Sequence, residues 1–184
     1  MKPEDFIKKQ IHDVKAFRSI LTTESDRGCA LYATSYLDKA LSDLLYCALA
    51  YDKNIEKDLF EGNAPLAQFS ARIKFCFYLG KISKIERRDL DLLRKIRNEF
   101  AHSADAITFE NEKISNQCRE LSFTYHEKDT RPRNHFTASC LGILANIHRE
   151  TLLCQAPQIK EDNPPSEKRI SKARQAMKPE SNGA

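Results

Sequence analysis

Three side chains that could together cleave RNA lie within one six-residue stretch, namely Arg97, Asn98 and His102. A guanidinium binds phosphate through forked hydrogen bonds, and an imidazole exchanges a proton near neutral pH. His102 could act as the general base toward a ribose 2′-hydroxyl or as the acid toward the leaving oxygen. Arg97 could stabilise the charge that develops on the phosphorus centre, and Asn98 could orient the imidazole or donate to a phosphate oxygen. This chemistry needs no metal, and we predict neither a metal site nor a cofactor.

The spacing of these residues on a helix limits what one copy of the chain can do. Asn98 and His102 are four residues apart and therefore share a face. Arg97 and His102 are five residues apart, which separates them by about 140° around the helix axis. One helix therefore cannot direct both side chains onto one small target, whereas two such helices facing each other could. We predict a homodimer in which two copies share the site.

An ordinary structural role would explain the same residues. A cation at a helix carboxyl terminus is stabilised by about 0.3–1 kcal/mol through the helix dipole, which would suit His102. Arg97 could form a surface ion pair with Asp91 or Glu99, a common arrangement on helices. The spacing alone leaves the catalytic and the structural interpretation open.

Basic residues around this segment could form a surface for nucleic acid. The chain has a net charge of +4, and residues 81–102 contain seven basic residues against four acidic ones. We expect phosphate contacts from the basic side chains of this helix and the one before it, namely Arg72, Lys74, Arg94 and Lys95. Charges on a surface helix more often face solvent, so a solvated face is the alternative. The partner predicted from this charge is RNA or DNA.

Helices must position all of these side chains, because the sequence has five glycines, no tryptophan and no alternating strand pattern. Ser83 followed by Glu86 is a capping box, which predicts that the helix carrying Arg97 begins there. A wide apolar face over residues 27–51 predicts a helix at the centre of a bundle. We predict the all-α class, a helical bundle of about five to six helices with a disordered carboxyl-terminal tail.

The other elements follow from local signals. Pro3 suits the first position of a helix that continues to Leu21, and Pro65 suits the start of another helix, which Gly80 ends as its carboxyl-terminal cap. Ile107 and Phe109 are expected to anchor the loop that follows the charged helix. Further helical segments are expected within residues 54–64, 111–121 and 135–153.

The composition divides the chain into two regions. Residues 1–156 are predicted to form the helical bundle domain. From residue 157 onward the chain is rich in Pro, Lys, Glu and Ser and poor in apolar residues, which predicts a disordered basic tail over residues 157–184. Nucleic-acid binding by this tail would be mainly electrostatic. Its basic residues include Lys168, Arg169, Lys172 and Arg174.

Composition also excludes several classes of protein. The sequence has no run of about twenty apolar residues that could span a membrane, and its start lacks the apolar core of a signal peptide. We therefore expect a cytoplasmic protein with no membrane partner. The six cysteines lack the close pairing of zinc or redox motifs. Four of them lie in apolar helical runs, where cysteine packs as a small hydrophobe.

The middle of the chain resembles the mannitol operon repressor family. The resemblance is carried by an ordered set of motifs in residues 59–74, 78–82 and 89–96, with Ala64 in place of the family's usual glycine before Pro65. It covers residues 58–121, about a third of the chain. The resemblance implies an all-helical fold and a role in transcriptional repression without an ordinary helix-turn-helix. Such a regulator would act through contacts with a protein partner or with nucleic acid.

The segment from Arg97 to His102 is also similar to the arginine–four residues–histidine motif of HEPN domains, which are helical bundles that often dimerise. This resemblance implies that Arg97, Asn98 and His102 form the site of a metal-independent endoribonuclease of the toxin or antiviral kind. We place the mannitol-repressor-like regulator first and the HEPN-type ribonuclease second, and the sequence leaves both open.

Overall fold

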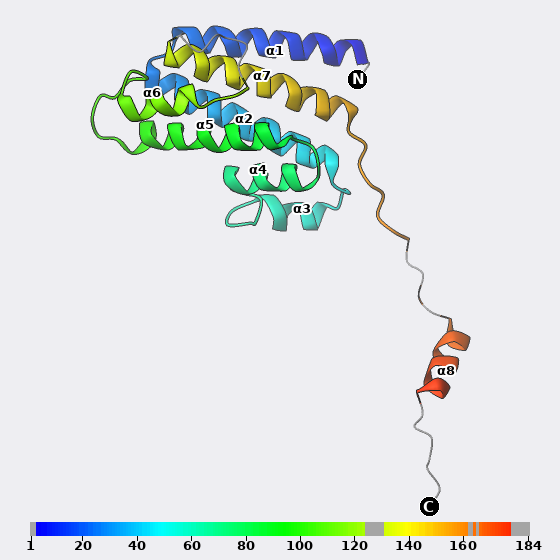
Figure 1. The fold of residues 1–184 in the computed structure, drawn as a ribbon. Coiled ribbons are helices and arrows are strands. Elements are labelled where there is room, and N and C mark those ends of the chain that lie inside the picture. The colour runs from blue at the N-terminus through cyan, green and yellow to red at the C-terminus, as the bar shows by residue number, and fades with distance from the viewer. Residues whose placement is uncertain (1–2, 124–130, 162–163, 165, 178–184) are drawn as a thin grey trace, which may run out of the picture.

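The computed structural model describes residues 3–123, 131–161, 164 and 166–177. These residues form helices and no strands, which confirms the predicted all-α class (Figure 1). The helices are α1 Pro3–Thr23, α2 Asp26–Ala48, α3 Lys53–Phe60, α4 Phe69–Tyr78, α5 Lys84–His102, α6 Glu112–Arg119, α7 Pro132–Leu153 and α8 Glu167–Ala176.

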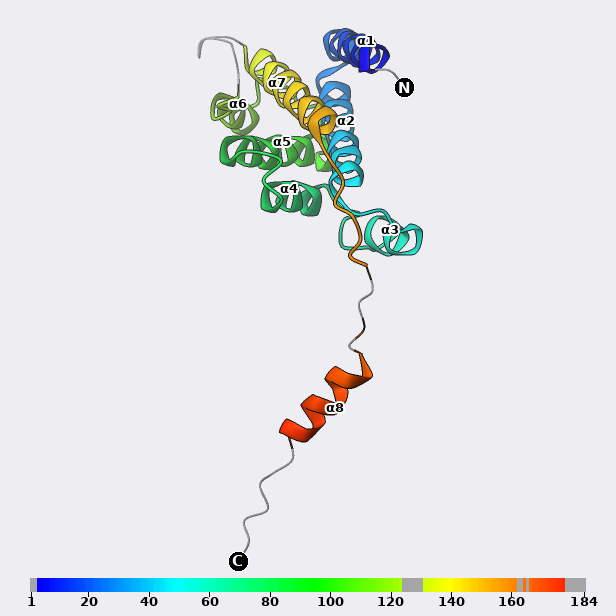
Figure 2. The same cartoon turned by 90° about the vertical axis from the view of Figure 1, so that its right-hand side faces the viewer.

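Eight helices in the described part of the chain exceed the five to six that were predicted. One of them, α8, lies within residues 157–184, which were predicted to be disordered. The prediction relied on the scarcity of apolar residues, whereas α8 is composed mainly of Glu, Lys, Arg and Ala, which favour a helix locally. Helix α8 contacts no other described helix and lies apart from the bundle in both views (Figures 1 and 2).

Helix α2 lies at the centre of the bundle, as its wide apolar face predicts. It packs against α1, α4, α5 and α7, and its longest shared surface is with α7. Figure 1 shows α1 and α5 on opposite sides of the α2–α7 pair. The apolar side chains of α2 that face these neighbours are fully buried, among them Leu37, Leu41, Leu44 and Leu45.

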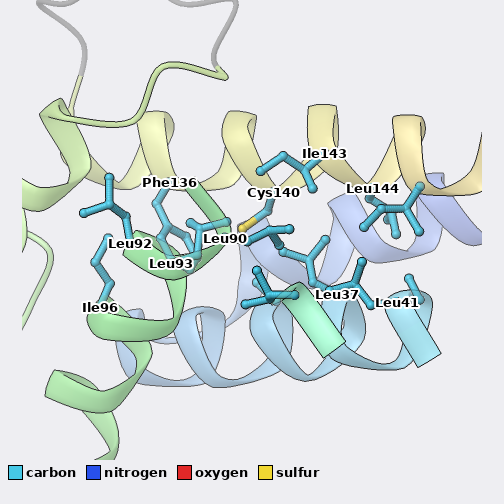
Figure 3. Close-up of a cluster of buried hydrophobic side chains, with 14 of the residues drawn as sticks. Leu37, Leu41, Leu90, Leu92, Leu93, Ile96, Phe136, Cys140, Ile143 and Leu144 are labelled. Carbon is cyan, nitrogen blue, oxygen red and sulfur yellow. The ribbon is translucent and has the colours of Figure 1, made fainter. Parts of the chain in front are cut away.

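The core joins the helix that carries the candidate site to the centre of the bundle. Figure 3 shows leucines of α5 packed between α7 and α2. Leu90, Leu93 and Ile96 of α5 and Phe136 and Cys140 of α7 are completely buried. Burial of each of these leucine, isoleucine and phenylalanine side chains contributes about 1.5–3 kcal/mol. The orientation of α5 is therefore set by the core and not by its surface charges.

Helix α4 ends where predicted but begins later. Gly80 has φ +68, and its N–H donates to Phe77 O at 3.0 Å while Lys81 N–H donates to Cys76 O at 2.9 Å. This is the glycine cap expected from the sequence. The predicted start at Pro65 is wrong, because residues 65–68 form turns and the helix begins at Phe69. Leu66 N–H donates back to Leu59 O at 2.8 Å, so this segment is tied to the end of α3.

The cysteines behave largely as packing residues. Cys29, Cys76, Cys118 and Cys140 are buried, as expected for small hydrophobes in apolar runs. Burial raises the pKa of the Cys29 thiol to about 11 and of the Cys76 and Cys118 thiols to about 12. In the described residues, every helix is too short or too polar to cross a membrane.

Candidate functional site

The amino-terminal end of α5 is fixed by the predicted capping box. Ser83 N–H donates to Glu86 Oε2 at 2.7 Å, and Glu86 N–H donates to Ser83 Oγ at 3.2 Å. The second carboxylate oxygen of Glu86 accepts a hydrogen bond from Asn146 Nδ2 of α7 at 3.0 Å. Glu86 therefore caps α5 and also joins it to α7, so the helix is held by polar contacts as well as by its core.

A buried carboxylate fixes α5 to the turn that follows α6. Asp89 is completely buried, and its Oδ2 accepts hydrogen bonds from Ser122 N–H at 2.8 Å and Phe123 N–H at 2.6 Å. Burial raises the pKa of Asp89, and the amides of Phe123 and Ser122 oppose that rise by stabilising the ionised form. Arg88 donates to Ser122 Oγ at 2.7 Å beside it. The role of Asp89 was not predicted. Its position on the apolar face of the helix, three residues after Glu86, could have indicated a buried carboxylate with a structural role.

The carboxyl-terminal end of α5 is also held in place. Arg27 of α2 donates to Ser103 O at 2.9 Å and to Asp105 O at 2.8 Å, directly after the last residue of α5. Phe109 is 1% exposed and anchors the following loop, as predicted. Its ring centroid lies 4.9 Å from that of Phe100 on α5. The segment around His102 therefore starts from a fixed helix end.

Arg97, Asn98 and His102 lie at this end of α5, close to the surface. Arg97 and His102 are exposed and Asn98 is half-buried. Arg97 Nη1 donates to Asn98 Oδ1 at 3.0 Å. Within the described residues, His102 forms no hydrogen bond or ion pair with either of them. Arg97 and Asn98 are therefore in contact, whereas His102 lies one helical turn further along. The exposed side chain of His102 is accessible to another molecule.

The four predicted phosphate-binding residues are not equivalent. Arg72 Nη1 forms an ion pair with Asp38 at 2.7 Å and Nε donates to Leu66 O at 2.8 Å, with 14% of its side chain exposed. Arg94 lies 3.7 Å from Asp91 on the same helix. Lys74 on α4 and Lys95 on α5 are exposed. Arg72 therefore links α4 to α2, whereas Lys74 and Lys95 form no ion pair within the part of the chain that the structure describes.

An apolar groove on α4, which we call the α4 groove, was not predicted. It has a volume of about 330 Å³. Tyr78 is 90% exposed and Phe75 is 37% exposed in its wall. Its lining residues are Leu59, Pro65, Leu66, Ala71, Lys74, Phe75 and Tyr78. The sequence of α4 contains more large apolar residues than one buried face can hold, which could have predicted an exposed apolar surface. Of the residues of α4, only Ile73 and Cys76 are fully buried.

A second groove lies between α1 and α7 and has a different character. Its volume is about 540 Å³, and its wall on α7 consists mainly of small and polar residues such as Thr137, Ala138 and Gly142. No aromatic side chain lines it among the described residues. Aromatic residues are the commonest anchors at protein interfaces. The α4 groove is therefore the stronger candidate for contact with another protein.

Comparison with known proteins supplies a family for this fold. The sequence model of the mannitol repressor family matches residues 9–152. The chain is 27% identical over 122 residues to the mannitol operon repressors of Escherichia coli strain K12 and of Escherichia coli O6:H1 strain CFT073. This alignment covers 64% of the chain and 58% of each repressor, so the chain spans little more than half the length of these curated relatives.

A solved structure has a similar fold. A chain in the X-ray structure of the MtlR-HPr complex from Escherichia coli superposes with a TM-score of 0.52 and 21% sequence identity. The superposition covers 74% of this chain and 96% of that chain. The family match ends at residue 152, one residue before the end of α7, so α8 lies outside it.

Proposed function

Because the chain belongs to the mannitol repressor family, we propose that it is a transcriptional regulator that acts by binding a protein partner. The structural neighbour is a complex of MtlR with HPr, which makes HPr the first partner to test for this chain. The observation that carries the proposal is the α4 groove, which presents exposed aromatic side chains on the outside of the bundle. It lies within the matched residues.

The chemistry of the α4 groove suits a protein partner. Exposed apolar side chains that cluster on a small domain are typical of interaction sites. Tyr78 offers a large rigid ring with a polar hydroxyl, the kind of side chain enriched at the centre of interfaces. Lys74 beside it supplies a cation at the rim, where charge steers association and contributes less to affinity. Both ends of α4 are fixed, by Arg72 at its start and by Gly80 at its end.

Replacement of Tyr78 tests this proposal. We expect wild-type protein to bind purified Escherichia coli HPr in a calorimetric titration. Tyr78→Ala should weaken that binding by about tenfold to thirtyfold, because truncating an aromatic anchor at an interface costs about 1.4–2 kcal/mol. Tyr78 is 90% exposed, so the same change should leave the thermal midpoint almost unchanged.

Tyr51 provides the matched control, because it is 71% exposed and lies outside the α4 groove. Tyr51→Ala should bind HPr within twofold of wild type. Absence of binding by the wild type would remove HPr as the partner. Equal weakening by the two tyrosine variants would contradict the position of the binding site on the α4 groove.

A second candidate function is metal-independent cleavage of RNA at the carboxyl-terminal end of α5. It is favoured by the exposure of Arg97 and His102 on a fixed helix end, where a second copy of the chain could approach. In such a dimer, His102 of one copy would exchange the proton while Arg97 stabilises the charged transition state. The products would be a 2′,3′-cyclic phosphate and a 5′-hydroxyl.

Incubation of purified protein with single-stranded RNA in EDTA tests this candidate. If the ribonuclease proposal is right, wild type cleaves the RNA, and Arg97→Ala and His102→Ala each reduce the rate by at least about 100-fold. That is the usual contribution of a group that stabilises transition-state charge, as for Arg97, and of a general acid or base, as for His102. Arg149→Ala is the control, since that exposed arginine lies on α7. Cleavage that survives both substitutions at α5, or falls equally with Arg149→Ala, would remove the catalytic proposal.

A further inference from the structure

Helix α8 is a basic element with no partner in the described structure. It comprises ten residues, Glu167–Ala176, and follows the bundle after a proline-containing linker. It contacts none of the other described helices, and Figure 2 shows it well separated from the bundle. The family match ends before it, at residue 152. The function of the bundle therefore does not account for α8.

The segment that begins with α8 is strongly basic. Residues 167–178 contain five lysines and arginines and one glutamate. The chain has 30 basic and 26 acidic residues in total, so the remainder has 25 of each and is neutral. The net charge of these twelve residues is therefore +4, which equals that of the whole chain. A concentrated positive charge on one exposed element attracts a polyanion.

Three basic residues of α8 share one face of the helix. Lys168, Arg169 and Lys172 are exposed and fall within an arc of about 100° around the axis. Ile170 lies on the opposite side of the axis and is 37% exposed. The three basic side chains can therefore contact one surface together.

We propose that α8 binds duplex DNA, with Lys168, Arg169 and Lys172 contacting backbone phosphates across the major groove. The major groove of B-form DNA is wide enough to admit an α-helix, whereas that of A-form RNA is deep and narrow. A helix that lies on a membrane surface buries a broad face of large apolar residues. Ile170 is the one large aliphatic residue of α8, so the composition favours DNA over a lipid surface. This role adds a DNA contact to a bundle proposed to bind protein.

Fluorescence anisotropy with the full-length chain and a labelled 20-base-pair DNA duplex tests this proposal. The affinity of the wild type should fall steeply as NaCl rises from 50 to 200 mM. The triple variant Lys168→Gln, Arg169→Gln, Lys172→Gln loses three phosphate contacts. Its logarithmic salt slope should be shallower by about 2.7, and its affinity at 50 mM NaCl should be at least about tenfold lower.

A control variant removes the same charge from the bundle. Lys15, Lys53 and Lys57 are exposed on α1 and α3, and replacing all three with Gln should leave DNA affinity within twofold of wild type. Tyr78→Ala should also bind DNA normally, which separates this proposal from the one on the α4 groove. Equal loss in the two triple variants would overturn the proposal, and so would absence of DNA binding by the wild type. Binding to phosphatidylserine vesicles in place of DNA would overturn it as well and assign α8 to a membrane surface.

Discussion

Phe109→Ala is expected to lower the free energy of unfolding by about 3–5 kcal/mol, because truncating a buried phenylalanine removes apolar contact and leaves a cavity. Phe109 is 1% exposed. Its ring centroid lies 4.9 Å from that of Phe100 on α5 and 5.0 Å from that of Phe136 on α7. It is the middle ring of three, and it connects the two helices to the loop after α5. Urea denaturation followed by circular dichroism measures the change.

Phe75→Ala is the matched control for this prediction. Phe75 is 37% exposed in the α4 groove, so its truncation removes less buried apolar area than that of Phe109 and should cost only about 1–2 kcal/mol. A loss below 1 kcal/mol for Phe109→Ala, or equal losses for the two variants, would contradict the role assigned to the three rings. In hydrogen exchange, Phe109→Ala should also speed exchange of the amides after α5, whereas Phe75→Ala should not.

The parts of the fold that were predicted correctly rest on local signals. The capping box of Ser83 and Glu86 and the cap at Gly80 each depend on residues within one turn of each other. The central position of α2 follows from the width of its apolar face alone. Ile107 and Phe109 could be assigned as anchors because they are the two large apolar residues of the loop after α5. Such signals need no knowledge of which helix packs against which.

The parts that could not be predicted depend on contacts between distant residues. Arg72 has the same charge as Lys74, but its ion pair with Asp38, 34 positions earlier, makes it a link between helices. The start of α4 moved from Pro65 to Phe69 because Leu66 is bound to the end of α3. The α4 groove exists because packing buries Ile73 and leaves Phe75 and Tyr78 on the surface. The spacing of apolar residues alone does not show which face of α4 is buried and which is exposed.

The sequence was sufficient to predict the residues of the candidate site at the end of α5. It was not sufficient to predict which residues surround them. Arg97, Asn98 and His102 could be named from their types and spacing. Their exposure follows from the packing of α5 on α2 and α7, and the helix end is fixed by Arg27, which lies 76 positions before Ser103. The polar network behind the site joins residues that are far apart in the sequence, so local patterns could not predict it.

Arg133 forms the longest-range polar links of the described residues, and its ion pair with Asp26 is one of them. Arg133 Nη1 lies 2.7 Å from Asp26 Oδ1, and Nη2 donates to Leu21 O at 2.8 Å and to Glu24 O. The second oxygen of Asp26 accepts a hydrogen bond from Phe109 N–H at 3.0 Å. One ion pair thus joins the α1–α2 turn, the loop after α5 and the start of α7. Its two side chains are 27% and 24% exposed, so water screens them only in part.

Arg133→Met should lower the free energy of unfolding by about 2–4 kcal/mol, because it leaves a partly buried carboxylate and two carbonyl groups without their donor. Arg149→Met on the same helix is the control. Arg149 is 64% exposed and lies 3.4 Å from the adjacent Glu150, so its replacement should cost less than about 0.5 kcal/mol. Adding Asp26→Asn to Arg133→Met should cost less than the sum of the two single changes, since the remaining charge is removed with its partner. Strict additivity in urea denaturation, or equal losses for the two arginine variants, would show that the pair does not hold these three segments together.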